Sequence, residues 1–163
     1  MMITIRLADY ADAADAAALV DLLDAYARDP AGGGEALADV AKQRLVSELA
    51  ARPHAFSILA WSGSEPVGLV NCLEGFSTFA ARPLVNVHDV VVREGWRGHG
   101  VGARMLALAE QESRRRGAVK MTLEVLSGNQ PAWSLYQRLG FAPYQLRPEM
   151  GDARFLQKWL GEP

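Results

Sequence analysis

Three alternating glycines, Gly98, Gly100 and Gly102, follow Arg97 and are the residues of this chain best suited to chemistry. They lie between a β-branched run and a helical pattern, so we expect a helix to begin within them. The first turn of a helix has unpaired backbone N–H groups and a partial positive charge, and it therefore attracts anions. Glycine lacks the Cβ atom that would hold a large anion away from these groups. The stretch predicts a phosphate or pyrophosphate site, and an ordinary glycine-rich turn is the alternative.

The spacing Gly98-x-Gly100-x-x-Ala103 also matches the fingerprint of dinucleotide-binding folds, with Glu124 as the later acidic residue. In that fingerprint the first glycine follows a strand immediately, whereas residues 93–97 intervene here. The fold also needs several further strand–helix units, and too little chain follows the glycines to supply them. An oxidoreductase that binds a nicotinamide or flavin dinucleotide is therefore a remote alternative.

A polar turn at Asn129, a short predicted helix and Tyr136 on the apolar side of that helix form a second group of residues. In this order and at this spacing, this group and the glycines resemble the GNAT superfamily of acetyl-CoA-dependent N-acetyltransferases. The resemblance follows the order of the predicted elements over residues 3–160. The stretches that carry it are residues 97–102, residues 129–141 and, as a similarity to some bacterial members, Asn86-x-His88-Asp89.

In that family the glycine loop and the helix start bind the pyrophosphate of coenzyme A, and the strand before the loop pairs with the pantetheine arm. The resemblance thus implies acetyl-CoA as the cosubstrate and no metal ion. The residues that it assigns to acetyl-CoA are Val90, Val91, Val92, Arg97, Gly98, His99, Gly100, Val101, Gly102, Asn129 and Tyr136. The strand at residues 119–126 would splay away to leave room for the arm. His99 departs from the lysine or arginine that is frequent there, and a solvent-facing histidine is the alternative.

Acetyl transfer to an amine makes three demands on such a site. The amine must be neutral, the thioester oxygen must be stabilised as it gains negative charge, and the leaving thiolate needs a proton. A backbone N–H group near Val91 or Val92 is suited to stabilise the oxygen. Tyr136, with an ordinary pKa of about 10, is suited to donate the proton. A core position for the Tyr136 ring is the alternative.

Two residues are candidates for the general base. His88 lies on the strand that leads to the glycines, and its ordinary pKa suits proton transfer at neutral pH. A structural, hydrogen-bonded histidine is the alternative there. Glu124 lies on the adjoining strand and would act directly or through water. Strict alternation puts Asn86 and His88 on one face of the strand and Asp89 on the other, which makes Asp89 a buried or turn-bonding carboxylate.

The hydrophobic pattern predicts the elements that position these residues. The expected strands are residues 3–7, 55–61, 66–73, 84–92, 119–126, one beginning at Phe141, and 154–160. The expected helices follow a cap at Asp9 or Asp12, span residues 35–51, run from the glycines to residues 114–116, and run from Pro131 to Leu139. Residues 75–79 fit either the end of a strand or a loop.

This order and the resemblance together imply an α+β (mixed αβ) fold of the GNAT type. We expect a single central, mostly antiparallel, twisted sheet of about seven strands, with helices on both faces and a splay between strands 4 and 5. We also expect one domain over residues 1–163.

The composition limits the classes of partner. The 163-residue chain has a formal net charge of −2, so we expect no general attraction to nucleic acid or to a membrane surface. The three arginines at residues 114–116 fit a helix C-terminus better than a nucleic-acid site. Cys72 is the only cysteine, which excludes an intrachain disulfide and a cysteine metal cluster and fits a reducing cytoplasm. The sequence leads us to expect neither a leader nor a membrane span.

No motif identifies the acceptor. Its site would be built from the first two helices, residues 32–34 and residues 76–82, and residues 32–34 fit a flap and a plain connector equally well. A non-catalytic acyl-CoA-binding or regulatory domain of the same fold is the functional alternative. A homodimer formed through the last strands is implied by the family alone.

Overall fold

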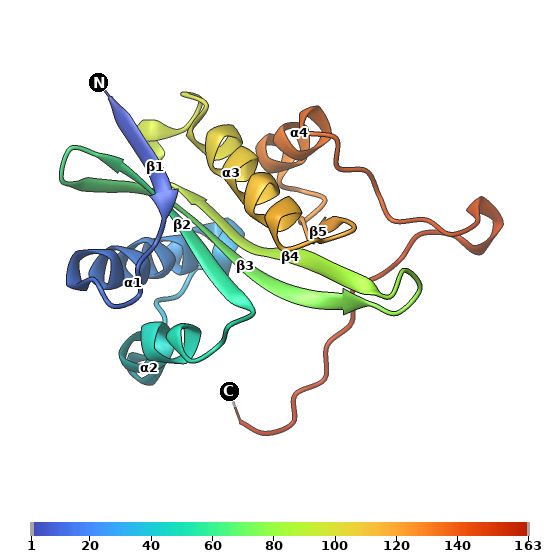
Figure 1. The fold of residues 1–163 in the computed structure, drawn as a ribbon, viewed down its shortest axis with the longest axis horizontal. Helices are drawn as coiled ribbons and strands as arrows, with labels where there is room; N and C mark the ends of the chain where they lie inside the picture. The colour runs from blue at the N-terminus through green and yellow to red at the C-terminus, as the bar shows by residue number, and fades with distance from the viewer. Residues whose placement is uncertain (1, 163) are drawn as a thin grey trace.

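The structure, a computed structural model, describes residues 2–162 and contains a twisted sheet between two layers of helices (Figure 1). Its strands are β1 (Ile3–Leu7), β2 (Ala55–Ser62), β3 (Glu65–Ser77), β4 (Arg82–Val92) and β5 (Met121–Leu123). They lie in the order β1-β2-β3-β4-β5, in which β1 to β4 are antiparallel and β5 is parallel to β4. The sheet is therefore mostly antiparallel, as predicted, and it differs from the parallel sheet of a dinucleotide-binding fold.

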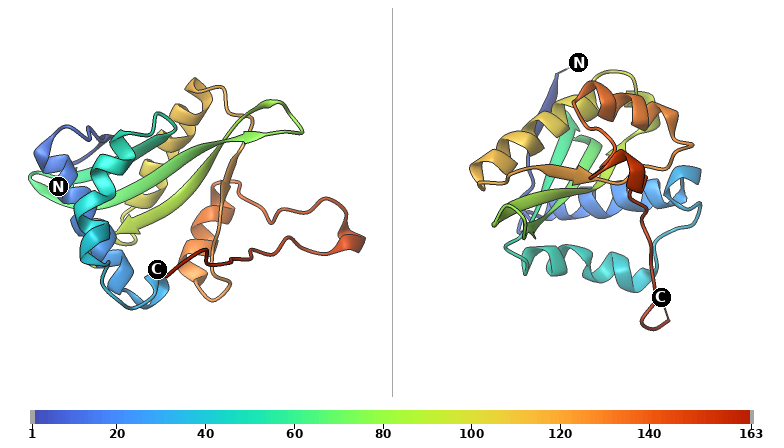
Figure 2. Two further views of the ribbon diagram at one scale, coloured as in Figure 1. Left: turned by 90° about the horizontal axis from the view of Figure 1, so that it is seen from below. Right: turned by 90° about the vertical axis from the view of Figure 1, so that its right-hand side faces the viewer.

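Helices cover both faces of this sheet (Figure 2). The α-helices of the described residues are α1 (Ala13–Arg28), α2 (Asp39–Ala50), α3 (Val101–Arg115) and α4 (Gln130–Arg138). Short 3₁₀ turns form η1 (Pro30–Gly32), η2 (Glu94–Trp96) and η3 (Pro148–Met150). Helices α1 and α2 lie on one face, and α3 and α4 lie on the other. No helix within residues 2–162 is long and apolar enough to cross a membrane.

Local signals in the sequence set the helix ends. Asp12 begins α1, where its side chain accepts a hydrogen bond of 2.9 Å from the backbone N–H of Asp15. Asn129 begins α4 in the same way and accepts a bond of 3.3 Å from Ala132. Gly117 follows the end of α3 with a φ angle of +77°, which glycine adopts without strain. The ends at Asp12 and Gly117 match the predicted caps, whereas Asn129 was predicted as a ligand contact and not as a cap.

Helix α2 begins at Asp39, later than the expected residue 35. The backbone N–H of Leu37 donates a hydrogen bond of 2.8 Å to the carboxylate of Asp24, and the N–H of Glu35 donates one of 3.1 Å to the carbonyl of Ala27. These N–H groups bond to α1, so the segment before Asp39 is held as a loop against that helix.

Two apolar clusters fix the layers. On one face Ile58, Val85 and Met105 belong to a cluster that joins the sheet to α3 and α4. On the other face Leu19 and Leu59 belong to a cluster that joins the sheet to α1 and α2. Fully burying each such side chain stabilises the fold by roughly 1.5–3 kcal/mol. Val101 also belongs to the first cluster and Val92 packs against it, so this cluster fixes the end of β4 against the start of α3.

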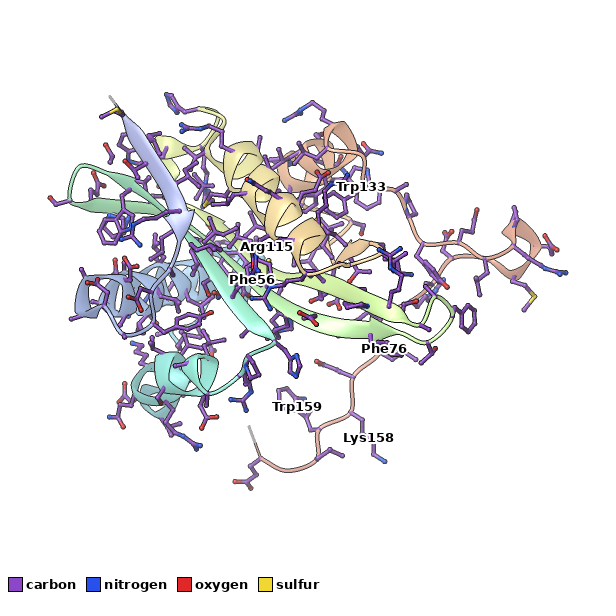
Figure 3. All side chains as sticks on the ribbon, viewed as in Figure 1. Phe56, Phe76, Arg115, Trp133, Lys158 and Trp159 are labelled. Atoms are coloured by element: carbon purple, nitrogen blue, oxygen red, sulfur yellow. The ribbon has the colours of Figure 1, made fainter. Side chains whose placement is uncertain are left out.

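The prediction of about seven strands is wrong, because the described residues form five. No strand begins at Phe141 and none spans residues 154–160. Residues 142–162 leave the body, turn at η3 and return beside it (Figures 1 and 2). Figure 3 shows Trp159 standing out from this segment, and its side chain is 67% exposed. An apolar pattern forms a strand only where its backbone groups meet a partner strand, and this segment meets none within the described chain.

The arginines at the end of α3 pair within the chain. Arg114 pairs with Glu110 at 2.7 Å, and Arg115 pairs with Glu112 at 2.6 Å. Arg116 also reaches Glu112, at 2.9 Å. These ion pairs favour the predicted capping role over a nucleic-acid site.

Candidate active site

The pairing between β4 and β5 ends before β4 reaches the glycine loop, which we define as residues 97–102. Their last paired residues are Val87 and Leu123, where β5 ends, whereas β4 continues to Val92. The strand expected at residues 119–126 is shorter than predicted, because only Met121–Leu123 pair with β4. From His88 onward, no strand of the described chain lies on this side of β4. This open edge lies where the splay between strands 4 and 5 was expected, and we refer to it as the splay. Its unpaired backbone groups are available to an extended ligand.

The glycine loop connects η2 to α3 and presents free backbone donors. Gly98 and Gly100 have φ angles of +80° and +76°, a conformation that favours glycine. A Cβ atom on either residue would meet no other atom within 4 Å, so the space beside them is open. Within the described chain, the N–H groups of residues 98–103 donate no hydrogen bond. Free donors beside open space at a helix start fit a pyrophosphate group.

The last two residues of the loop also shape the core. Val101 is buried, and a Cβ atom on Gly102 would lie 3.2 Å from the side chain of Leu135 in α4. The third glycine therefore allows α3 and α4 to approach closely. At both positions only the backbone N–H is available for a ligand.

The side chain of Arg97 is engaged elsewhere. Its Nε donates a hydrogen bond of 3.1 Å to the carbonyl of Val92, and its Nη2 lies 3.1 Å from the carboxylate of Asp29. The Nδ1 atom of His99 lies 3.0 Å from the Arg97 carbonyl, and its ring meets that of Trp96 edge to face. We call the free N–H groups of residues 98–103 the cradle. It consists of main-chain groups alone, while both side chains predicted to bind phosphate, those of Arg97 and His99, contact protein.

A β-bulge interrupts β4 at His88. Asn71 pairs with Asp89 and Cys72 pairs with Val87, so His88 is an extra residue without a partner in β3. Val87 belongs to the cluster under α3, whereas Val91 belongs to the cluster under α1 and α2, although their positions differ by an even number. The predicted strict alternation is therefore wrong across the bulge, because the extra residue reverses the order of faces.

The two candidate bases lie on either side of the splay. His88 is exposed, and its Nδ1 atom lies 3.1 Å from Oδ1 of Asn86, which itself donates a bond of 3.0 Å to Thr122 in β5. This contact fits the structural alternative for His88 and leaves its Nε2 atom without a partner among the described residues. Glu124 lies one residue beyond the end of β5 and is exposed, with no ion pair in the described chain.

Tyr136 lies on α4 and is 9% exposed. Burial, and to a lesser extent the neighbouring Tyr26, raises the pKa of its hydroxyl to about 12. Its ring meets that of Phe141 edge to face, as a core position requires, but its hydroxyl has no hydrogen-bond partner within the described chain. The residue also lines a cavity of about 370 Å³ between α4 and β5, together with Leu123 and Trp133. Asn129, the other predicted contact at α4, uses its carbonyl oxygen to cap the helix.

A row of hydrogen-bonded polar side chains was missed by the sequence reasoning. Asn71 donates a bond of 3.0 Å to Asp89, and Ser57 donates one of 2.6 Å to Asn71. The hydroxyl of Tyr10 lies 2.9 Å from that of Ser57. Ser57 and Asn71 are 1% and 5% exposed. The available signal was Ser57 within the otherwise apolar residues 55–61 and Asn71 within the otherwise apolar residues 66–73. Within residues 2–162, no group of histidine, cysteine or acidic residues is arranged to hold a metal ion.

Comparison with known proteins places this geometry in a family. Residues 16–141 match the model of the acetyltransferase (GNAT) family. The chain belongs to this family. This confirms the resemblance that the glycine loop and residues 129–141 indicated.

Relatives of this GNAT family member carry different names. It is 37% identical over 79 residues to streptothricin acetyltransferase from Streptomyces lavendulae, a match that covers 47% of this chain and 42% of that protein. It is 33% identical over 73 residues to the L-methionine sulfoximine/L-methionine sulfone acetyltransferase from Pseudomonas aeruginosa, covering 45% and 41%. The chain thus spans less than half the length of these curated relatives. A solved structure of a probable acetyltransferase is 20% identical in sequence to this chain. The match covers 99% of this chain and 100% of the other, and the two share the fold with a TM-score of 0.78.

Proposed function

We propose that this GNAT family member transfers an acetyl group from acetyl-CoA to an amine. The observation that carries the proposal is the juxtaposition of two open backbone surfaces. The glycine loop offers free N–H groups at the start of α3, and the unpaired edge of β4 from His88 to Val92 leads directly to it. A long ligand with a diphosphate at one end and an amide-containing arm fits both surfaces at once.

The main chain would hold acetyl-CoA, which supplies a thioester-activated acetyl group. The N–H groups of residues 98–103 bind the pyrophosphate, and Val90, Val91 and Val92 pair with the pantetheine arm. In an antiparallel ladder alternate backbone groups point away from the partner strand. An N–H group near Val91 or Val92 therefore points into the splay, where it stabilises the developing negative charge on the acetyl oxygen.

Tyr136 is assigned to the leaving sulfur. With a pKa of about 12, its hydroxyl is protonated at any physiological pH and is always ready to donate a hydrogen bond. An ordinary thiol has a pKa of about 8.5, so the buried phenol is the weaker acid. We therefore assign Tyr136 first as the hydrogen-bond donor that stabilises the thiolate, with proton donation following from the same atom.

His88 and Glu124 are the sequence-derived candidates for the base. Each keeps free acceptor capacity at the splay, through Nε2 of His88 and the carboxylate of Glu124. Exposure of both side chains allows either to act through a water molecule.

Thiol release from acetyl-CoA, measured across a panel of amines, tests the proposal. We expect release that depends on the amine and on enzyme concentration, and an acetylated amine by mass spectrometry. Binding of acetyl-CoA without thiol release from any amine would instead favour the non-catalytic acyl-CoA-binding domain. Absence of binding would overturn the coenzyme A site itself.

A further inference from the structure

We propose that Asp89 binds the acceptor amine and receives its proton, and that Tyr10, Ser57 and Asn71 hold Asp89 in place through a buried chain of hydrogen bonds. The proposal rests on the acetyl transfer proposed above and gives Asp89 a role that the family resemblance does not assign to it. It assigns the acceptor to the face of the sheet covered by α1 and α2.

The chain of hydrogen bonds crosses the sheet at right angles to the strands. Ser57 of β2, Asn71 of β3 and Asp89 of β4 are directly paired neighbours in the register. Their side chains bond at 2.6 Å and 3.0 Å, and Tyr10, which lies between β1 and α1, completes the chain at 2.9 Å. The neighbouring residues Leu59, Leu69 and Val91 on this face are apolar, so the row is a polar line through an apolar layer.

The direction of every bond in the row follows from the chemistry of its last member. An ionised carboxylate only accepts, so the amide nitrogen of Asn71 must face Asp89 and its carbonyl oxygen must face Ser57. Ser57 therefore donates to Asn71, and its oxygen is left to accept from the hydroxyl of Tyr10. All donors thus point toward Asp89. Bonds aligned in this way polarise one another and stabilise a negative charge at the end of the chain.

Asp89 occupies the place where an acceptor must meet the acetyl group. It follows the bulged His88 and lies two residues beyond Val87, the last residue of β4 that pairs with β5. One carboxylate oxygen accepts from Asn71, and within the described chain the other has no partner. The bulge turns Asp89 to the face opposite α3 and α4. An amine bound there approaches the splay from the side that the helix of the glycine loop does not cover.

The charged and titratable groups around Asp89 leave its charge uncompensated. Burial first, and then the charges of Asp89 and Asp29, raises the pKa of Tyr26 in α1, so Tyr26 is neutral. Burial raises the pKa of Cys72 in β3 to about 12, so this thiol is also neutral. Asp29 is paired with Arg97. The remaining neighbour, His88, bonds to Asn86.

Asp89 makes no ion pair within the described residues, so a protonated amine is its natural partner. Tyr26, whose hydroxyl also has no hydrogen-bond partner in the described chain, packs against the apolar cluster that contains Val91, on the face of the sheet where Asp89 lies. Tyr26 also contributes to the raised pKa of Tyr136, the residue assigned to the leaving sulfur.

The proton balance is simple. The amine binds to Asp89 as an ammonium ion and gives one proton to solvent before it reacts. The neutral nitrogen then forms a bond to the acetyl carbon, and the carbon–sulfur bond breaks with its electron pair on sulfur. The nitrogen loses one further proton to the free oxygen of Asp89, and the sulfur takes the proton of the Tyr136 hydroxyl. The products are an amide and a thiol. Asp89 returns its proton to solvent and Tyr136 regains one from solvent before the next cycle.

The first test is Asp89→Asn, which preserves size and the bond from Asn71 by amide rotation. We expect kcat/KM for the amine to fall at least thirtyfold, while the dissociation constant of coenzyme A changes by less than twofold. Formate added to Asp89→Ala should restore part of the lost turnover, because it supplies a carboxylate at the same place. Turnover of Asp89→Asn within threefold of the natural chain would overturn the proposal. A natural chain that releases no thiol with any amine would instead overturn the acetyltransferase function.

The second test is a double-mutant cycle on the far end of the row. Tyr10→Phe removes only one hydroxyl, and we expect kcat to fall about threefold to tenfold with KM for acetyl-CoA unchanged. In the Asp89→Asn background the same substitution should have no further effect on kcat. Ser113→Ala, which deletes a buried hydroxyl bonded at 2.7 Å within α3, is the matched control and should leave kcat unchanged. Equal effects of Tyr10→Phe in both backgrounds would reduce the row to a structural element.

Discussion

The guanidinium of Arg97 lies 3.1 Å from the carboxylate of Asp29 and so ties the start of the glycine loop to the end of α1. Asp29 also accepts a hydrogen bond from the backbone N–H of Ala31, which begins η1. These bonds, that of Ala31 first, lower the pKa of Asp29 and keep it ionised. The same guanidinium that the family resemblance assigns to a phosphate is thus held by a carboxylate at the end of α1, one of the helices expected to build the acceptor site.

This pair predicts competition between Asp29 and the cosubstrate for Arg97. In Asp29→Asn the amide oxygen still caps η1, but the charge that holds Arg97 is gone. We expect coenzyme A to bind about threefold more tightly, in line with the roughly 0.2–1 kcal/mol of an exposed ion pair. Isothermal titration calorimetry measures the change. Asp21→Asn, which removes another pair between α1 and an arginine, is the control and should leave the affinity unchanged. Weaker binding in Asp29→Asn would show that Arg97 does not move to the phosphate.

The glycine loop was predictable because its chemistry is local. Backbone donors at a helix start and positive φ angles depend on a few consecutive residues, and Gly98 and Gly100 have both features. The position of Tyr136 on the inner side of α4 follows from helical periodicity in the same way. Neither feature requires knowledge of the sheet register.

A second prediction separates the cradle from the fold at Gly100. A leucine there puts a side chain into the open space beside the free N–H groups, so we expect at least a hundredfold loss of coenzyme A affinity. A residue other than glycine at a φ angle of +76° also costs about 1–2 kcal/mol of folding stability. Gly117→Leu carries the same strain, since Gly117 has a φ angle of +77° and equally open surroundings at the other end of α3. Equal affinities of the two variants would contradict the cradle.

The third prediction concerns the hydroxyl of Tyr136. Tyr136→Phe keeps the ring and its contact with Phe141 but deletes the hydroxyl that we assign to the leaving sulfur. We expect turnover to slow at least tenfold while the affinity for coenzyme A is unchanged, because the arm is held by main-chain groups. Steady-state kinetics and calorimetry give the two quantities separately. Turnover within twofold of the natural chain would leave Tyr136 with a packing role alone.

The row that ends at Asp89 was not predictable from the sequence, because it depends on which residues of separate strands lie opposite one another. Ser57, Asn71 and Asp89 meet only through the register of β2, β3 and β4. The bulge at His88 then reverses the face on which Asp89 lies, and alternation cannot foresee an inserted residue. The strands predicted from Phe141 and over residues 154–160 are absent from the described chain for a related reason. Their apolar pattern is present, but no strand of the sheet pairs with them.

The final prediction tests the electrostatics of the N-terminal corner. Asp15 is 1% exposed and forms two hydrogen bonds, of 2.5 Å and 2.6 Å, with Arg6. Burial alone would raise the pKa of this carboxyl, but the bonds from Arg6 and from the backbone N–H of Asp9 outweigh it, so its pKa is lowered. Asp15→Asn should therefore reduce the free energy of unfolding by about 2–3 kcal/mol at pH 7, measured with urea.

The pH dependence of that loss has a defined sign. A carboxyl whose pKa is lower in the folded state adds stability above its unfolded pKa of about 3.9, and this contribution is lost as the pH falls through the folded value. The gap between the natural chain and Asp15→Asn should thus be constant from pH 7 to about pH 5 and close only below about pH 4. Glu110→Gln, which breaks the exposed pair with Arg114, should cost less than about 1 kcal/mol at every pH. A gap that has already closed at pH 5 would mean that Asp15 is not held ionised by Arg6.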